Sequence, residues 1–257
     1  MNRTQARVLL AAALSGGVVA SGPAHAQATL KPDGQWRHAI GLGLSYASGN
    51  SESSTLTLNA DGVRQTGHDK WSYYGKALRA ESDDEVTGDQ IGLGTRYERD
   101  LNARVFGFGQ GDYLRDRPAN LSRRTSVGMG LGYHVFKSDT LNWDVFSGLG
   151  YTHDRYVEPT DIAGTNRSTW GYAELLIGQE SNHQISDTST FRQRLVIYPN
   201  LSESGEYRAQ FDAGLAVAIN DRMSLTATLT YRYNSDPGVD LEKGDLLFVT
   251  GISAKIE

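Results

Sequence analysis

From Trp36 onwards, hydrophobic and polar residues alternate along the chain in about twelve short segments. The clearest segment covers residues 206–219, where every second residue from Tyr207 to Ile219 is apolar or aromatic. A period of two places apolar and polar side chains on opposite faces of a β-strand. About ten such residues, tilted across a bilayer, span its hydrocarbon layer. The pattern predicts an all-β protein: a single transmembrane antiparallel up-and-down β-barrel of about twelve strands.

The segment at 104–114 is the least clear of the predicted strands. Phe106 and Phe108 share one face with Gln110 and Asp112, so its orientation stays open. The strands are predicted at 36–47, 54–64, 70–80, 88–99, 104–114, 124–136, 141–151, 169–180, 188–198, 206–219, 224–234 and 245–256.

The connections between these segments alternate between short and long. Exported barrels have short periplasmic turns and longer external loops. The predicted periplasmic turns are 65–69, 100–103, 137–140, 181–187 and 220–223. The predicted external loops are 48–53, 81–87, 115–123, 152–168, 199–205 and 235–244, and they are rich in Pro, Asp, Asn and Gly.

Aromatic residues gather near the predicted strand ends, as expected for the two aromatic girdles of a membrane barrel. The alternative is that they are core aromatics of a soluble β-protein. The periplasmic girdle is predicted to contain Trp36, Trp71, Tyr97, Phe106, Tyr133, Trp143 and Phe191, and the outer girdle Tyr46, Tyr151, Tyr207, Tyr231, Tyr233 and Phe248.

Residues 1–26 resemble a secretory signal peptide. Arg3 and Arg7 precede an Ala-rich apolar stretch, and the A-x-A pattern at 24–26 predicts cleavage near Ala26. We therefore expect a signal peptide at 1–26, a periplasmic lead at 27–35, an outer-membrane barrel at 36–257, and a bacterial outer-membrane location.

Composition narrows the classes of function. The chain has no cysteine, so disulfides and thiolate chemistry are excluded. Removal of residues 1–26 takes away two arginines and no acid, so the formal charge falls from −5 to −7. This acidity argues against a nucleic-acid partner.

Four stretches follow one another in an order that resembles the bacterial domain-of-unknown-function 481 family. They are Ala47–Glu52 (ASGNSE), Gly148–Tyr156 (GLGYTHDRY), Tyr198–Leu201 (YPNL) and Tyr231–Pro237 (YRYNSDP). The resemblance covers nearly the whole chain after residue 26. It implies an outer-membrane barrel, of the kind described as a salt-induced outer membrane protein, and brings no catalytic residues. Such barrels usually end in an aromatic residue, whereas this chain ends in Ile256-Glu257, so insertion by the barrel-assembly machinery is expected to be less efficient.

The inward face of the predicted barrel carries charges of both signs, which must pair or be hydrated. One interpretation is a constriction that selects ions or small anions, and the other is a salt-bridged plug that holds the barrel in shape. Arginines from three consecutive strands form the one cluster with a predicted anion preference. The candidate pore-lining residues are Arg192, Arg194, Arg208, Asp212 and Arg232.

Other chemistry finds little support in the sequence. The Gly-x-Gly steps lie inside strands with no helix following, so they do not form a phosphate loop. The histidines lack metal-ligand spacing, and no His-x-Ser occurs. We expect no cofactor, metal or catalytic residue. Acidic residues of the external loops are expected to be solvated, with bridging through divalent ions to lipopolysaccharide phosphates as the alternative.

The most economical function is non-enzymatic: envelope structure or limited small-solute passage, linked to salt or osmotic stress by the resemblance. The expected partners are outer-membrane lipid, lipopolysaccharide and the barrel-assembly machinery. A lipid-modifying barrel hydrolase and a soluble periplasmic ligand-binding barrel remain as alternatives.

Overall fold

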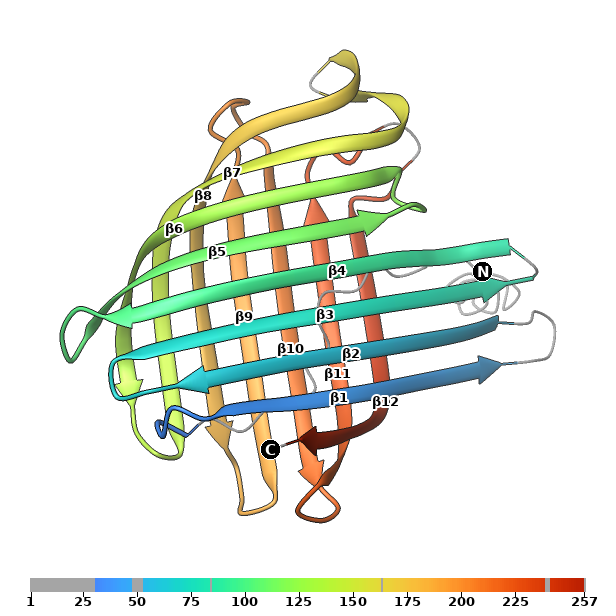
Figure 1. The fold of residues 1–257 in the computed structure, drawn as a ribbon. Helices are drawn as coiled ribbons and strands as arrows, with labels where there is room; N and C mark the ends of the chain where they lie inside the picture. Colours follow the sequence, from blue (N-terminus) through green and yellow to red (C-terminus); the bar gives the residue numbers. More distant parts are fainter. Residues whose placement is uncertain (1–30, 48–52, 84, 163, 239–240, 257) are drawn as a thin grey trace, which may run out of the picture.

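A computed structural model describes residues 31–47, 53–83, 85–162, 164–238 and 241–256, without the side chains of 45–47 and 53. The predicted signal peptide and residues 27–30 of the lead lie outside this part. Twelve antiparallel strands form one sheet in which each pairs with its neighbours in the sequence, and β1 pairs with β12 to close the barrel (Figure 1). The predicted fold class is confirmed. Within the described part, no helix is long and apolar enough to cross a membrane.

At the end of the barrel that carries the short turns, most strands begin or end close to their predicted positions. They are β1 (Trp36–Ala47), β2 (Ser53–Gln65), β3 (Asp69–Ser82), β4 (Glu85–Asp100), β5 (Val105–Asp116), β6 (Leu121–Lys137), β7 (Leu141–Ile162), β8 (Thr165–Gln184), β9 (Ser189–Pro199), β10 (Tyr207–Ala218), β11 (Met223–Asn234) and β12 (Gly244–Ile256).

The alternation along each strand separates an apolar exterior from a polar interior. Outward side chains are largely exposed: Leu44 is 68% exposed, and Met129 and Phe248 are 71% and 64% exposed. Their neighbours on the opposite face include buried polar residues such as Thr230 and Asp154. All strands except β5 carry large exposed apolar side chains, which would be costly in water and are typical of a lipid-facing surface.

The structure settles the orientation of β5. Phe106 and Phe108 are buried inside the barrel, and Gly107, Gly109 and Gly111 face outwards. Assignment of Phe106 to the periplasmic girdle is therefore wrong. Its ring stacks on that of His134, with centroids 4.8 Å apart.

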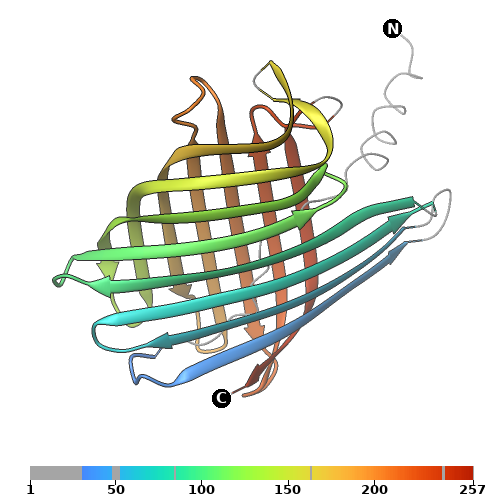
Figure 2. The same ribbon diagram turned by 45° about the horizontal axis from the view of Figure 1, so that its top comes forward.

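The outer hairpins are taller than the sequence indicates. The predicted loop 152–168 is mostly strand, because β7 and β8 continue as a hairpin to Ile162 and Thr165 (Figure 2). The predicted loop 81–87 is similarly reduced, since Ser82 already pairs with Glu85. Strands beyond the bilayer do not need an apolar face, so their polar composition resembles that of a loop.

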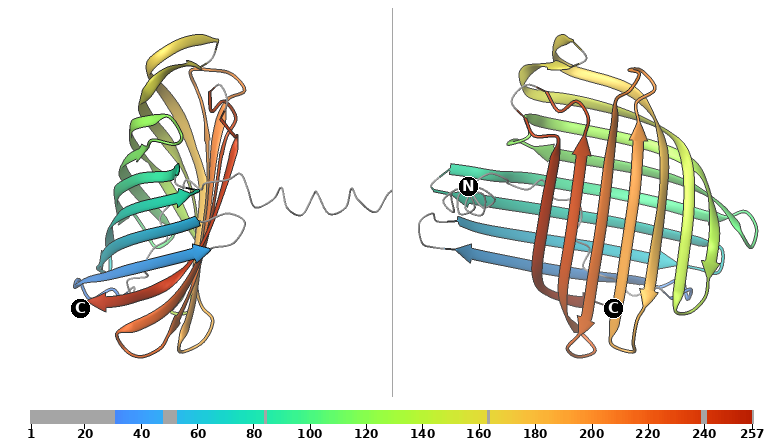
Figure 3. Two further views of the ribbon diagram at one scale, coloured as in Figure 1. Left: turned by 90° about the vertical axis from the view of Figure 1, so that its right-hand side faces the viewer. Right: turned by 180° about the vertical axis from the view of Figure 1, so that it is seen from behind.

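The front and back walls of the barrel cross one another, and the barrel is flattened (Figure 3). Small inward residues allow the walls to approach where β1, β2 and β12 meet. A Cβ atom added at Gly43 would lie 2.5 Å from Thr57 Oγ1 and 2.7 Å from Val249 Cγ1. The seam is short: β1 and β12 pair only from His38↔Ile256 to Gly43↔Gly251.

Aromatic rings form outward clusters at both ends of the strands. At the end with the short turns, which is predicted to face the periplasm and is called the periplasmic end below, the ring of Trp36 lies 6.1 Å from that of Trp71, which lies 6.3 Å from that of Tyr97. At the outer end, Tyr207 and Tyr233 stack at 5.3 Å. Outward positions are also taken by Tyr133, Trp143, Tyr151, Phe191, Tyr231 and Phe248, whereas the side chain of Tyr46 lies outside the described residues.

Candidate functional site in the barrel lumen

The barrel encloses a cavity of about 620 Å³ that follows the lumen from the periplasmic end towards the external loops. Its lining is rich in charged side chains. All five candidate pore-lining residues line this cavity: Arg192, Arg194, Arg208, Asp212 and Arg232.

Strand register explains how β9, β10 and β11 bring these residues together. Asp212 pairs with Arg194 across β9 and β10, and Gln210 pairs with Arg232 across β10 and β11. Since side chains on paired residues of neighbouring strands point to the same face, the inward positions form one charged surface.

Carboxylates neutralise much of this arginine cluster. Arg208 Nη2 lies 2.5 Å from Glu174 Oε2, and Arg194 Nε lies 3.6 Å from Glu180 Oε2. Asp212 instead accepts hydrogen bonds from Gln210 at 2.7 Å and Thr230 at 3.0 Å. The arrangement is therefore a mixed-charge surface and not a bare positive constriction.

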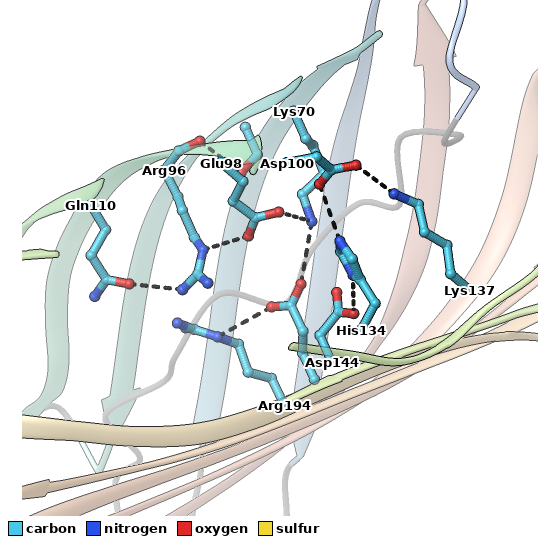
Figure 4. A network of polar contacts seen from close by, with 11 residues as sticks. Lys70, Arg96, Glu98, Asp100, Gln110, His134, Lys137, Asp144 and Arg194 are labelled. Atoms are coloured by element: carbon cyan, nitrogen blue, oxygen red, sulfur yellow. Dashed lines mark hydrogen bonds and ion pairs between the residues drawn. The ribbon is translucent and has the colours of Figure 1, made fainter. Parts of the chain in front are cut away.

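A second polar network crosses the lumen at its periplasmic end (Figure 4). Lys70 Nζ on β3 lies 2.7 Å from Glu98 Oε2 on β4 and 3.4 Å from Glu180 Oε1 on β8. Glu98 also accepts a hydrogen bond from Arg96 Nε at 2.6 Å. With the Arg194 contact to Glu180, the chain of charges joins β3 and β4 to β8 and β9, so it narrows the lumen.

His134 lies beside this network at the periplasmic rim. Its Nδ1 is 2.6 Å from Asp144 Oδ1, and its Nε2 is 3.1 Å from Asp100 Oδ1. Lys137 Nζ lies 2.7 Å from the second oxygen of Asp100. The four side chains tie β4, β6 and β7 together at the end of the barrel.

An apolar cluster lies within the lumen next to the same network. It contains Phe106, Phe108, Phe146, Leu176 and Val196. The Arg96 guanidinium lies over two of these rings, 4.1 Å from the Phe108 centroid and 4.5 Å from the Phe146 centroid. Such cation–π contacts hold the arginine in place where its charge would otherwise be poorly hydrated.

Glycines on neighbouring strands make room for the inward rings. A Cβ atom at Gly132 would lie 2.1 Å from Phe106 Cζ, and one at Gly178 would lie 2.5 Å from Phe146 Cζ. The Gly-x-Gly steps are thus packing positions, as expected for a narrow barrel.

The outer half of the lumen holds further paired charges. Arg124 forms a bidentate ion pair with Asp154, in which Nε lies 2.7 Å from Oδ1 and Nη2 lies 2.6 Å from Oδ2. Tyr74 donates to Asp112 at 2.7 Å. Sequence reasoning missed Asp154 because it falls in a predicted loop, and missed Asp112 because the orientation of β5 was open.

Glu180 was also missed, although one signal for it was available. It lies six residues after Glu174 on β8, so an uninterrupted strand of period two places both carboxylates on the inward face.

The described residues offer no group of three or more His, Asp or Glu side chains able to hold a metal ion. A serine and a histidine do meet on the outward face of β8, where Ser181 Oγ lies 3.0 Å from His183 Nε2. In the described part of the chain, no carboxylate contacts the other nitrogen of His183. A nucleophile–base pair without a third orienting group lacks part of the usual hydrolase arrangement.

Residues 40–255 match the family model described as a protein of unknown function, DUF481. The uncharacterized protein YdiY of Escherichia coli (strain K12) is 26% identical over 199 residues, which cover 77% of this chain and 74% of that protein.

Solved structures with a similar fold are barrels with low sequence identity. The NanC porin gives a TM-score of 0.45 at 10% identity, covering 84% of this chain and 97% of that one. The translocator domain of autotransporter NalP from Neisseria meningitidis gives 0.46 at 14% identity, covering 99% and 95%. The family match spans most of the chain, and this protein belongs to the DUF481 family.

Proposed function

We propose that this protein is a non-enzymatic barrel of the bacterial outer membrane that allows limited passage of small polar solutes. The observation that carries the proposal is a charged cavity of about 620 Å³ inside a barrel whose exterior is apolar. A structural role in the envelope and a link to salt or osmotic stress are part of the same proposal. The stress link rests on the family resemblance alone.

The outer-membrane location is supported by the exterior of the barrel and by the predicted export signal. Exposed leucine, isoleucine and methionine side chains lie between two levels of aromatic rings. A barrel satisfies its backbone hydrogen bonds internally, so its strands can cross a bilayer. Lipid is accordingly the partner that the exterior fits.

Passage is expected to be limited because the ion-paired network of Lys70, Glu98 and Glu180 crosses the periplasmic end of the lumen. Rings of charged side chains set which ions enter a pore and how fast they leave. With arginines and carboxylates paired to each other, the lumen has weak selectivity for the sign of the solute charge.

Single-channel recording in planar bilayers tests the proposal. We expect small conductance steps with weak ion selectivity. Glu174→Gln leaves Arg208 uncompensated and should shift selectivity towards anions, whereas Arg208→Gln should shift it towards cations. Absence of steps with correctly folded protein would overturn solute passage. Altered lipid profiles after incubation with the pure barrel would favour the hydrolase, and solubility without detergent would favour the ligand-binding alternative.

A further inference from the structure

The outer rim of the barrel wall formed by β3 to β7 carries arginines that point away from the lumen. Each lies on the same outward face as the apolar residues of its strand or in the adjoining turn. The arginines are Arg79, Arg115, Arg117, Arg123 and Arg155.

Three of these arginines are already neutralised by neighbouring carboxylates. Arg79 lies 2.9 Å from Glu81, and Arg115 lies 2.8 Å from Asp89. Arg117 lies 3.6 Å from the other oxygen of Asp89. Glu81 and Asp89 are therefore engaged by these three arginines.

Arg123 and Arg155 differ from the other three. They are directly opposite each other across β6 and β7, and both are exposed. Among the described residues, no ion pair or side-chain hydrogen bond involves either guanidinium. Like charges directly opposite each other on a sheet are destabilising, unless an anion lies between them.

The inner face of the same strands fixes this juxtaposition. Arg124 and Asp154, the residues next to the two arginines, form the bidentate ion pair inside the lumen. That contact holds β6 and β7 in register at this level. The two outward guanidinium groups are consequently held on adjacent strands without a partner from the described chain.

The position of the pair along the wall indicates what it meets. Two residues closer to the periplasm, Thr125 pairs with His153, and a further two residues down Val127 pairs with Tyr151. Val127 and Tyr151 are exposed members of the lipid-facing band. At about 3.3 Å per residue, Arg123 lies some 13 Å along the tilted strand from Val127, on the external-loop side of Tyr151 and within reach of the headgroup region of a bilayer.

We propose that Arg123 and Arg155 bind a phosphate group of lipopolysaccharide in the outer leaflet. Guanidinium groups match phosphate oxygens with paired hydrogen bonds, and two of them on adjacent strands provide a rigid cationic site. The site rests on the proposed outer-membrane location, and it lies on the rim opposite the short turns, where the outer leaflet carries this lipid. It does not depend on solute passage.

Binding of purified lipopolysaccharide to the refolded full-length barrel in detergent tests the proposal. The double variant Arg123→Gln/Arg155→Gln should bind on the order of tenfold more weakly, as expected for the loss of charge-assisted hydrogen bonds. Chemical removal of the lipid A phosphates should weaken wild-type binding by a similar factor and leave the double variant unaffected.

Arg99→Gln is the matched control, because Arg99 is also exposed and outward but lies at the periplasmic end of β4. It should bind like the wild type. Gel mobility of the unheated barrel verifies folding of each variant. The proposal would be overturned if the double variant bound lipopolysaccharide as tightly as the wild type does. It would also be overturned if the wild type bound vesicles of phosphatidylglycerol as tightly as lipopolysaccharide. A barrel that binds lipopolysaccharide but shows no conductance would overturn solute passage and leave this site intact.

Discussion

Lys70 and Glu180 face each other across the lumen from strands that are not neighbours in the sheet, and Nζ of the lysine lies 3.4 Å from Oε1 of the glutamate. The contact links β3 to β8 independently of the backbone ladder. Glu98 holds the same lysine from β4 at 2.7 Å. One cation thus joins two carboxylates at the periplasmic end of the barrel, where the lumen is also narrowed by aromatic rings.

Removal of this cation should widen the conducting path. Lys70→Met breaks both contacts and leaves Glu98 and Glu180 to repel each other, so we expect larger conductance steps and a shift towards cation selectivity. A stability loss of about 1–3 kcal/mol should accompany the change, because charged groups lose their partner. Single-channel recording measures the conductance. Steps equal to those of the wild type would show that the network does not limit passage.

The ion pair between Arg124 and Asp154 should contribute more to stability than the rim pair between Arg79 and Glu81. Asp154 is 1% exposed and binds the guanidinium through both oxygens, so Asp154→Ala leaves a buried charge unpaired and should cost about 3–5 kcal/mol. Glu81→Ala breaks a half-exposed pair and should cost less than about 1 kcal/mol. Urea unfolding in lipid vesicles provides the comparison. Equal losses in the two variants would contradict the burial argument.

Two glycines on adjacent strands should respond differently to the same substitution. Gly132→Ala places a methyl group against the Phe106 ring, at 2.1 Å from Cζ, and should destabilise the barrel by about 1–3 kcal/mol through overpacking. Gly109→Ala on the outward face of β5 meets nothing within 4 Å and should change stability by less than about 0.5 kcal/mol. Thermal shifts of the heat-modifiable band report both. A larger effect at Gly109 would refute the assigned orientation of β5.

The loop between β9 and β10 should be weakened as the pH rises. Burial, and then the negative charge of Asp236, raises the pKa of the Glu206 carboxyl above its usual value. A carboxyl with a raised pKa in the folded state stabilises that state below its unfolded pKa, and this stabilisation is lost as the pH rises through the folded pKa. Glu206→Gln mimics the protonated form and keeps an acceptor for Asn200, whose side-chain amide donates at 3.0 Å in the wild type.

The stability difference between the wild type and Glu206→Gln should therefore grow as the carboxyl ionises, with the variant more stable at neutral pH. Unfolding measured at pH 4 and pH 7 compares the two proteins. A constant difference, or a wild type that gains stability with pH relative to the variant, would show that the carboxyl is not destabilised in the loop.

Periodicity predicts the strands well between the short turns and the aromatic rings of the outer end. There every second residue of a strand that spans a bilayer must be apolar, because it faces lipid. Strand β10 illustrates this, since its outward residues from Tyr207 to Val217 follow the rule without a break. The rule fails for the part of β7 and β8 nearest the external loops, where exposed residues such as Glu158 and Thr169 are polar. There the backbone pairing of Thr160 with Arg167 extends the hairpin through residues that resemble a loop.

The candidate site was predictable only in part. Inward arginines such as Arg194 and Arg208 follow directly from strand parity. Their partners follow only in part: Glu180 lies directly opposite Arg194 across β8 and β9, whereas Glu174 on β8 reaches Arg208 on β10 past an intervening strand. Contacts between distant strands depend on barrel shape, and Phe106 shows how one strand of open orientation hides both an inward ring and an inward carboxylate at Asp112.

The absence of cysteine from the natural chain allows the most direct test of the lipid-facing exterior. Single cysteines at Met129, Leu149 and Leu225, which face outwards, and at Thr230, Ala216 and Ser224, which face the lumen, can carry an environment-sensitive fluorophore in vesicles containing brominated lipid. The barrel described here predicts strong quenching at the first three positions and weak quenching at the last three. Equal quenching at both sets, or none at either, would contradict a membrane-spanning barrel with a polar lumen.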